Sequence, residues 1–289
     1  MWILFAFGSA FFAGMTAILA KIGIRDTDSN VVTAIRTVVV LFFSWLLVFL
    51  TGAQGGLWEL GKGTLLFLIL SGLATGASWL CYFKALYLGD VNRVTPIDKS
   101  STVLTMLLAA FFLGESITWL KGVCMLLIAA GTYLMIAKKP VQDGNVNADV
   151  RWLLYACASA VFASLTSILA KIGMRGIDSN LGTAIRTVVV LIMAWVVVFV
   201  TKKQSSVRTL DRKSLLFICL SGIATGGSWL CYFKALQTGP ASVVVPIDKL
   251  SIVLTVAFSY LFLKEKLTKK SFAGLLFIVT GTLLLLLIK

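Results

Sequence analysis

Ten runs of about 20 mostly apolar residues decide what this chain of 289 residues can fold into. A helix needs about 20 apolar residues to cross the hydrocarbon core of a bilayer, and within that core the backbone polar groups must bond to one another. The runs are too long and too uniformly apolar to be strands of a membrane barrel. They predict an all-α integral membrane protein with ten transmembrane helices, at 2–22, 31–50, 64–86, 94–113, 120–137, 152–172, 181–200, 214–236, 243–263 and 270–288.

The composition excludes several classes of protein. Apolar residues make up 59% of the chain and charged residues 13%, whereas a soluble domain has about 45–50% and about 25%. The net charge of +14 comes from basic residues that lie mainly between the apolar runs. Loops of membrane proteins have this pattern, so nucleic acid is not an expected partner. The chain has no histidine, no metal-binding cysteine spacing and no phosphate-binding glycine loop. We therefore expect neither an enzyme nor a metal or cofactor site.

The chain consists of two copies of one sequence at a constant offset of 150 residues. The segment SGLATGASWLCYFKAL at 71–86 matches SGIATGGSWLCYFKAL at 221–236 in 14 of 16 positions. Segments that start at Ser29 and Pro96 match their counterparts in 11 of 13 and 8 of 10 positions. A tandem duplication explains matches at one offset. It predicts one repeat at 1–140, a linker at 141–150 and a second repeat at 151–289.

Each copy holds five predicted spans, and this odd number makes the second copy enter the membrane from the opposite face. The result is a pair of inverted-topology repeats, an architecture typical of secondary transporters. The charges agree. In the first copy two basic loop residues lie on the side where the copy begins and six on the other, whereas in the second copy the numbers are ten and four. By the positive-inside rule, we expect both termini outside and the 138–151 junction in the cytoplasm of a bacterial or archaeal cell.

Several motifs occur once per copy. They are AIR at 34–36 and 184–186, a third helix that ends in YFKAL, a Pro-bearing fourth helix that ends in LGE or LKE, and a Gly-containing fifth helix. With these motifs the whole chain resembles the EamA family of the drug/metabolite transporter superfamily. Each copy resembles the five-helix members, which pair as antiparallel dimers. The resemblance implies export or exchange of small metabolites by alternating access, here by a fused pseudo-dimer that is expected to be a monomer. Ten-helix members usually have cytoplasmic termini, and the charges of this chain indicate the reverse.

Charged side chains inside the predicted spans are the first candidates for a substrate site. A charge at mid-membrane costs about 2.5–3.5 kcal/mol on insertion scales, so one that persists needs a reason. We expect an anion-attracting vestibule at each mouth of a central cavity, where arginine grips a carboxylate or phosphate. The alternative is that each arginine forms an ion pair with an aspartate and holds the second and fourth helices of its copy together. The candidates are Arg36 and Arg186, Asp98 and Asp248, and Lys99 and Lys249.

The third helix of each copy adds aromatic candidates. Trp79 and Tyr82, with Trp229 and Tyr232 in the second copy, share a helix face with serines and threonines. Such rings form rigid, half-polar walls for a ligand. The alternative is an aromatic belt at the membrane interface.

The fourth helix carries three further features. Pro96 is interpreted as its first helical residue. Thr102 and Thr105 extend the face of Asp98 inward, which indicates either a polar pathway or close helix packing. Glu115 at its end, and Glu265 in the second copy, are interpreted as interfacial caps or as partners of nearby lysines.

Together these features predict a secondary transporter, an exporter or exchanger of a small polar metabolite, with an anionic or zwitterionic substrate favoured. The arginines would hold the substrate anion, and the aspartates would be counter-ions that substrate or a proton displaces. Two alternatives stay open, a flippase for a lipid-linked sugar or carrier lipid and a proton-coupled drug exporter. The related four-helix drug exporters use a glutamate in their first helix, and neither Trp2–Ile22 nor Trp152–Ile172 contains an acidic residue.

Overall fold

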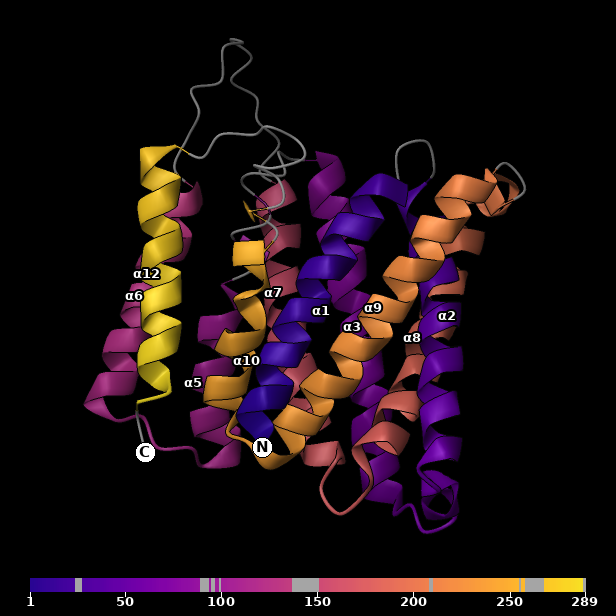
Figure 1. The fold of residues 1–289 in the computed structure, drawn as a ribbon, viewed down its shortest axis with the longest axis horizontal. Coiled ribbons are helices and arrows are strands. Elements are labelled where there is room, and N and C mark those ends of the chain that lie inside the picture. Colours follow the sequence, from indigo (N-terminus) through magenta and orange to yellow (C-terminus); the bar gives the residue numbers. More distant parts are fainter. Residues whose placement is uncertain are drawn as a thin grey trace.

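The computed structural model describes residues 1–23, 28–88, 94, 97–98, 100–136, 151–207, 210–254, 256–257 and 268–287. Within these ranges the chain is helical and contains no strand, which confirms the all-α prediction. The long helices stand side by side in one bundle (Figure 1). They are α1 (Trp2–Gly23), α2 (Ser29–Leu50), α3 (Lys62–Leu88), α5 (Ser101–Leu113), α6 (Trp119–Ile136), α7 (Arg151–Gly173), α8 (Ser179–Val200), α9 (Arg212–Thr238), α10 (Ala241–Lys249) and α12 (Lys269–Leu285), with short 3₁₀ helices η1 (Ala53–Leu57) and η2 (Gln204–Val207).

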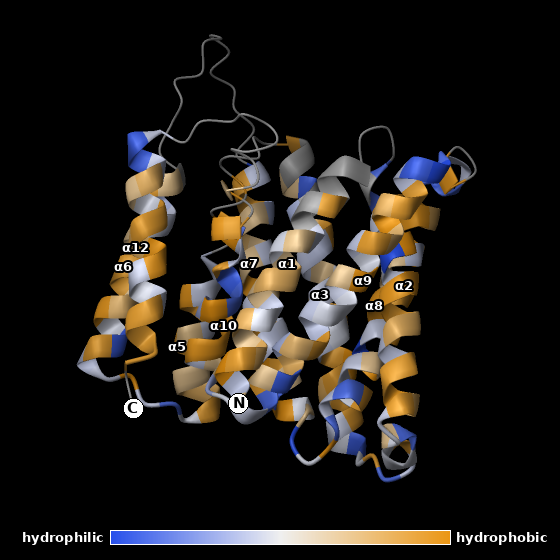
Figure 2. Cartoon of the chain, viewed as in Figure 1, coloured by the Kyte–Doolittle hydropathy of each residue, from blue (hydrophilic) through white to orange (hydrophobic). Residues whose placement is uncertain are grey.

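The outer surface of the bundle is apolar. Large side chains such as Phe111 and Leu126 are 82% and 72% exposed, and apolar residues cover the middle of the helices in Figure 2. Five helices in the described part are long and apolar enough to cross a membrane, at Asn30–Leu50, Lys62–Tyr82, Arg151–Gly173, Ser179–Val200 and Arg212–Thr238, and three shorter helices are also apolar. The protein is therefore an integral membrane protein. The count of ten spans stays a prediction.

Equivalent helices of the two halves pack against each other reciprocally. The first helix of each half lies against the third helix of the other, α1 against α9 and α3 against α7. The second helices α2 and α8 contact each other, and so do the fifth helices α6 and α12. The α6–α12 pair lies at one edge of the bundle in Figure 1. The interior of the bundle is therefore built by both halves together.

Glycines bring α6 and α12 into backbone contact. A Cβ atom added at Gly131 would lie 2.5 Å from the carbonyl oxygen of Gly274, and one at Gly274 would lie 2.6 Å from that of Gly131. No side chain fits at either position, because real Cβ contacts below 3.0 Å essentially do not occur. Small residues at such a crossing are typical of packed membrane helices.

The fourth helix of each half is interrupted, which the sequence analysis did not predict. In the second half α10 ends at Lys249, and the backbone tightens there, since Leu250 N bonds to Ile247 O at 3.0 Å and Val253 N to Leu250 O at 2.9 Å. In the first half Ser100 N bonds to Ile97 O and Val103 N to Ser100 O, both at 3.0 Å. These i→i−3 bonds are of the 3₁₀ type. Ser100 and Leu250 occupy equivalent positions in the two copies.

Helix α10 also begins earlier than expected. The predicted span started at 243, but α10 starts at Ala241 and holds Pro246 in its interior. Proline in a helix interior removes one backbone bond, and α10 ends three residues later. The interpretation of Pro96 as a first helical residue falls outside the described residues, and its counterpart Pro246 does not have that position.

Both ends of the chain lie at the same face of the bundle, and α7, which opens the second half, begins at the opposite face (Figure 1). We call the first of these the termini face. The turn between α9 and α10 also lies there, because Gly239 packs on the ring of Trp2.

Candidate functional site

A cavity of about 300 Å³ lies between the two halves. Helices α1 and α3 of the first half and α7, α8, α9 and α10 of the second contribute to its wall. Six of the ten predicted site residues line it: Trp79, Arg186, Trp229, Tyr232, Asp248 and Lys249. Arg36, Asp98 and Tyr82 are described but do not line it. Lys99 lies outside the described residues.

Arg186 is the most constrained charged group in the cavity wall. Arg186 as a whole residue is only 1% exposed. Its Nε donates to Ser71 Oγ at 2.9 Å and its Nη2 to Thr75 Oγ1 at 3.1 Å. These two acceptors lie one turn apart on α3, so they share a helix face. Their own hydroxyl protons go elsewhere, from Ser71 to Thr166 O and from Thr75 to Ser71 O. Both oxygens are therefore left to accept from the guanidinium.

One nitrogen of Arg186 is left over. Nη1 is buried and has no hydrogen-bond partner in the structure. An unpartnered donor on a buried charge is costly, and buried polar groups in native proteins are nearly always bonded. A ligand anion is one partner that would satisfy it.

Arg36 has the equivalent arrangement with fewer bonds. Its Nη2 donates to Thr225 Oγ1 at 2.9 Å, and its buried Nε has no partner. Thr225 and Ser221 give their protons to Ser221 O and Thr16 O. Each arginine thus bonds to the third helix of the opposite half.

This arrangement corrects the ion-pair interpretation. Neither Arg36 with Asp98 nor Arg186 with Asp248 forms an ion pair among the described residues, where the ion pairs are Lys171–Glu115 and Lys203–Asp28. The interpretation failed because the arginines face hydroxyl groups across the interface between the halves. The sequence of one copy alone does not indicate that its arginine bonds to hydroxyl groups of the other copy.

The two aspartates each accept a hydrogen bond from a serine of the other half. Ser9 Oγ donates to Asp248 Oδ1, and Ser159 Oγ donates to Asp98 Oδ1 at 2.8 Å. Each serine also lies 3.3 Å from a serine of the third helix, Ser228 or Ser78 respectively. The repeated pattern shows that the halves place their aspartates in the same way, although only Asp248 lines the cavity.

Aromatic side chains form much of the cavity wall. Trp79 and Trp229 meet with ring centroids 5.8 Å apart, and Phe233 stands edge-on to Trp229 at 6.4 Å. The hydroxyl of Tyr232 lies 2.7 Å from Ser167 Oγ. Tyr82 instead packs in a separate apolar cluster with Ala85, Val94 and Ala156. The expected aromatic wall therefore forms from three of the four predicted rings, with Phe233 added.

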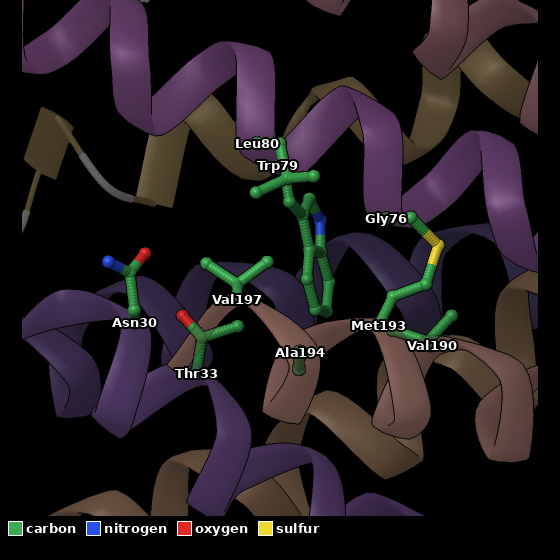
Figure 3. Close-up of a pocket in the computed structure, with 9 residues that line it drawn as sticks. All are labelled: Asn30, Thr33, Gly76, Trp79, Leu80, Val190, Met193, Ala194 and Val197. Carbon is green, nitrogen blue, oxygen red and sulfur yellow. The ribbon is translucent and has the colours of Figure 1, made fainter. Parts of the chain in front are cut away.

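A second, small pocket lies behind Trp79 (Figure 3). Its volume is about 20 Å³, which is room for a water molecule at most. Figure 3 shows the indole of Trp79 pointing toward Ala194 on α8, with the Met193 side chain extended to Gly76. The pocket is a packing gap that a metabolite does not fit.

Sequence reasoning missed several residues of this site. Ser9 and Ser159 were not singled out, although they occupy equivalent positions in the first helix of each half. That identity at the offset of 150 was the available signal. Phe233 belongs to the YFKAL motif and was passed over because a phenylalanine in an apolar run carries no distinguishing mark. Thr102 and Thr105 are buried on α5 and do not line the cavity, which favours the packing interpretation of that stripe.

Comparison with known proteins decides the family. Residues 1–137 and 150–287 both match the EamA-like transporter family. The chain belongs to this family. The resemblance inferred from the motifs is thereby confirmed, and each half matches separately, as expected of a duplicated transporter sequence.

Two relatives match this EamA-like chain over different lengths. An uncharacterized transporter in the cobO 3′ region of Sinorhizobium sp. is 46% identical over 134 residues, which are 46% of this chain and 95% of that protein. One half of this chain thus corresponds to nearly a whole protein. The S-adenosylmethionine uptake transporter of Rickettsia bellii is 28% identical, covering 75% of this chain and 71% of that protein.

A solved crystal structure has the same fold as this EamA-like protein. It superposes with a TM-score of 0.77 over 99% of this chain and 96% of the other, at 16% sequence identity. At that identity the likeness concerns the fold alone.

Proposed function

We propose that this protein is a secondary transporter, an exporter or exchanger of a small polar metabolite that carries a carboxylate or phosphate and is anionic or zwitterionic. Transporter relatives and the EamA-like family match support transport as such. The chemistry of the cavity supports the substrate class. The single observation that carries the proposal is Arg186, which lines the cavity and keeps one buried nitrogen without a partner.

The other cavity residues fit a zwitterion. A substrate anion would bind Arg186 Nη1, with Lys249 adding positive charge, and an ammonium group would bind the Asp248 carboxylate. The Trp79–Trp229 pair offers flat apolar surface to the rest of the molecule. S-Adenosylmethionine, named as the substrate of one relative, has the carboxylate, ammonium group and flat ring that this cavity would bind. Its sulfonium gives it a net positive charge, so it shares the carboxylate of the proposed substrate class but not the net charge.

The mechanism we propose is alternating access between two inverted five-helix repeats, 1–140 and 151–289, joined by 141–150. Reciprocal packing of α1 with α9 and of α3 with α7 supports it, and so do the interruptions at Ser100 and Leu250 in both fourth helices. Transporter sites typically lie at discontinuous helices near the membrane midplane, where two repeats meet. Rocking of one repeat against the other would expose the cavity to each side in turn.

We place both termini outside a bacterial or archaeal plasma membrane, with the 138–151 junction in the cytoplasm. The distribution of basic residues supports this orientation. A reporter fused after Lys289 is expected to be external. A cytoplasmic reporter would reverse the orientation.

A thermal-shift screen of the detergent-purified protein tests the substrate class. Ligands that bind only the folded state raise the unfolding midpoint. We expect stabilisation by anionic or zwitterionic metabolites, lost in Arg186→Gln. The matched control is Arg212→Gln, which removes the same charge from an exposed position at the start of α9 and is expected to keep the stabilisation. Stabilisation only by lipid-linked compounds, or only by cations without a carboxylate or phosphate, would replace the proposal with a flippase or a drug exporter.

A further inference from the structure

Glu115 of the first half binds the start of α10 in the second half. Its Oε1 accepts from the backbone N–H of Ala241 at 2.7 Å and its Oε2 from that of Ser242 at 3.0 Å. The same carboxylate lies 3.5 Å from Lys171 Nζ on α7. The expectation that Glu115 is a cap or a lysine partner is confirmed in both parts, and the helix it caps belongs to the other half. Its counterpart Glu265 lies outside the described residues.

The Glu115 carboxylate acts as the N-terminal cap of α10. The first N–H groups of a helix have no partner within it, and Pro240, the residue before α10, forms no side-chain cap. A carboxylate at this position also meets the positive end of the helix dipole. Gly114, with φ of +68°, ends α5 and turns the chain at the residue before Glu115. Capping of α10 thus comes from a neighbouring helix end.

Lys171 and Gln237 extend this contact across the termini face. Lys171 Nζ also donates to Gly239 O in the turn between α9 and α10. Gln237 Nε2 donates to Met174 O at 2.9 Å, in the turn after α7. The side chains of Lys171 and Glu115 are only 16% and 13% exposed. The ends of α5, α7 and α9 and the start of α10 are therefore joined through polar groups at one face.

This cluster lies between the cavity and the termini face. Asp248, which lines the cavity, is seven residues beyond Ala241 on α10, a rise of about 10 Å along a helix. Ser167, another cavity residue, lies one turn before Lys171 on α7. Tyr232 lies on α9 before Gln237 and bonds to Ser167. These groups therefore lie between the cavity and the termini face on α7, α9 and α10.

We propose that Glu115 is a latch between the two halves, which holds the mouth at the termini face closed and positions α10 with Asp248 at the cavity. The latch rests on the alternating-access function proposed above. Opening that mouth requires α10 to move away from α5 and α7, so the carboxylate must release both N–H groups and Lys171. The latch therefore biases the protein toward the state in which this mouth is closed.

Labelling of a cavity cysteine tests the latch. The five native cysteines are replaced by alanine, Ser167→Cys is added as the reporter, and a membrane-impermeant maleimide is applied to one face of oriented vesicles at a time. With Glu115 present, we expect slow labelling from the termini face. In Glu115→Gln we expect labelling from that face to be about tenfold faster, the factor that follows from losing a hydrogen bond to a charged group.

The matched control is Glu59→Gln, the same change at an exposed residue just before α3. It is expected to leave the rate unchanged. Lys171→Met provides a second variant if Glu115→Gln does not fold, and we expect faster labelling from the termini face there too, by a smaller factor because both N–H groups stay capped. Equal rates in Glu115→Gln, Lys171→Met and Glu59→Gln would overturn the latch.

The outcome separates the latch from the substrate proposal. Labelling needs no ligand, so a failed thermal-shift screen with Glu115-dependent labelling would leave the latch intact. A protein that binds an anionic metabolite but shows no effect of Glu115 on labelling would lose the latch alone.

Discussion

The guanidinium carbon of Arg186 lies 3.9 Å from the centre of the Phe233 ring, and the two residues are 1% and 3% exposed. Such a cation–π contact is worth about 2 kcal/mol when it is desolvated. With Ser71 and Thr75 holding two of its nitrogens, the ring fixes the plane of the guanidinium. The remaining nitrogen is thereby presented in one orientation, and a fixed donor loses little entropy when a ligand binds.

Phe233→Leu is expected to weaken ligand binding more than it weakens the fold. Leucine keeps much of the apolar volume, so the loss of unfolding free energy should stay below about 1.5 kcal/mol. Loss of the stacked ring should raise the Kd for the anionic ligand about tenfold. Isothermal titration of both proteins gives the Kd values. An unchanged Kd would mean that the two hydroxyl groups are sufficient to position Arg186.

Thr75→Val removes the acceptor of Arg186 Nη2 with little change of shape. We expect the unfolding free energy to fall by about 1–3 kcal/mol, because a donor on a buried charge is left unpaired. Thr132→Val is the control, since Thr132 is also buried and bonds to the i−4 carbonyl of Ile128 but has no bond to an arginine. Denaturant titration measures both variants. Equal losses would show that the bond to Arg186 contributes nothing to stability.

Gly131→Ala is expected to separate α6 from α12. Its Cβ would overlap a backbone carbonyl that cannot rotate away, and overpacking of this kind costs about 1–3 kcal/mol. Gly122→Ala on the same helix meets nothing within 4 Å and should stabilise the protein by about 0.4–1 kcal/mol. Thermal unfolding should therefore shift in opposite directions for the two variants. A shift in the same direction would contradict the close approach of the two helices.

The stability that Glu115 provides should depend on pH in a defined direction. Burial by itself raises the pKa of this carboxyl. The hydrogen bonds from Ser242 and Ala241 and the charge of Lys171 outweigh burial, and the pKa lies below its ordinary value of 4.5. A lowered folded-state pKa means that the contribution is complete above the ordinary value and is lost as the pH falls through the folded-state value.

The pH dependence is measured as the difference in unfolding midpoint between the wild type and Glu115→Gln. We expect a constant difference above pH 4.5 and a shrinking one below it. Among the described residues, Lys171 is the charged group that acts on the carboxylate, Arg175 acts on Lys171, and Lys121 Nζ donates to the carbonyl oxygen of Ser116, the residue after Glu115. All three are basic and keep their charge at acid pH, so they do not titrate in this range. A difference that grows on acidification would show that the carboxylate destabilises the folded state.

Much of the fold could be predicted because burial in lipid leaves a simple record in the sequence. The predicted span 181–200 became Ser179–Val200, extended only to the residue after its Asp178 cap. The fourth helix of the second half was predicted less well, at 243–263. Its start is capped by Glu115, which is far away in sequence, and no local pattern records that contact. Its interruption at Leu250 follows Pro246 by four residues, but the sequence interpretation treated proline in this helix as a first helical residue and so expected none.

The candidate site was predictable in its residue types but not in its partners. Six of the ten proposed residues line the cavity, because charges and polar aromatic groups in apolar helices need a polar environment. The bonds of Arg186 to Ser71 and Thr75 cross from one half to the other. Such contacts depend on how the halves pack, and a comparison of one copy with the other shows only which positions are equivalent.

The most direct test of the central claim is uptake by proteoliposomes of the metabolite that stabilises the protein. The account predicts that Arg186→Gln, folded and reconstituted in equal amount, loses uptake at least about tenfold, whereas Arg212→Gln transports like the wild type. Wild-type uptake by Arg186→Gln would contradict the account, because the cavity would then recognise its substrate without the buried guanidinium that lines it.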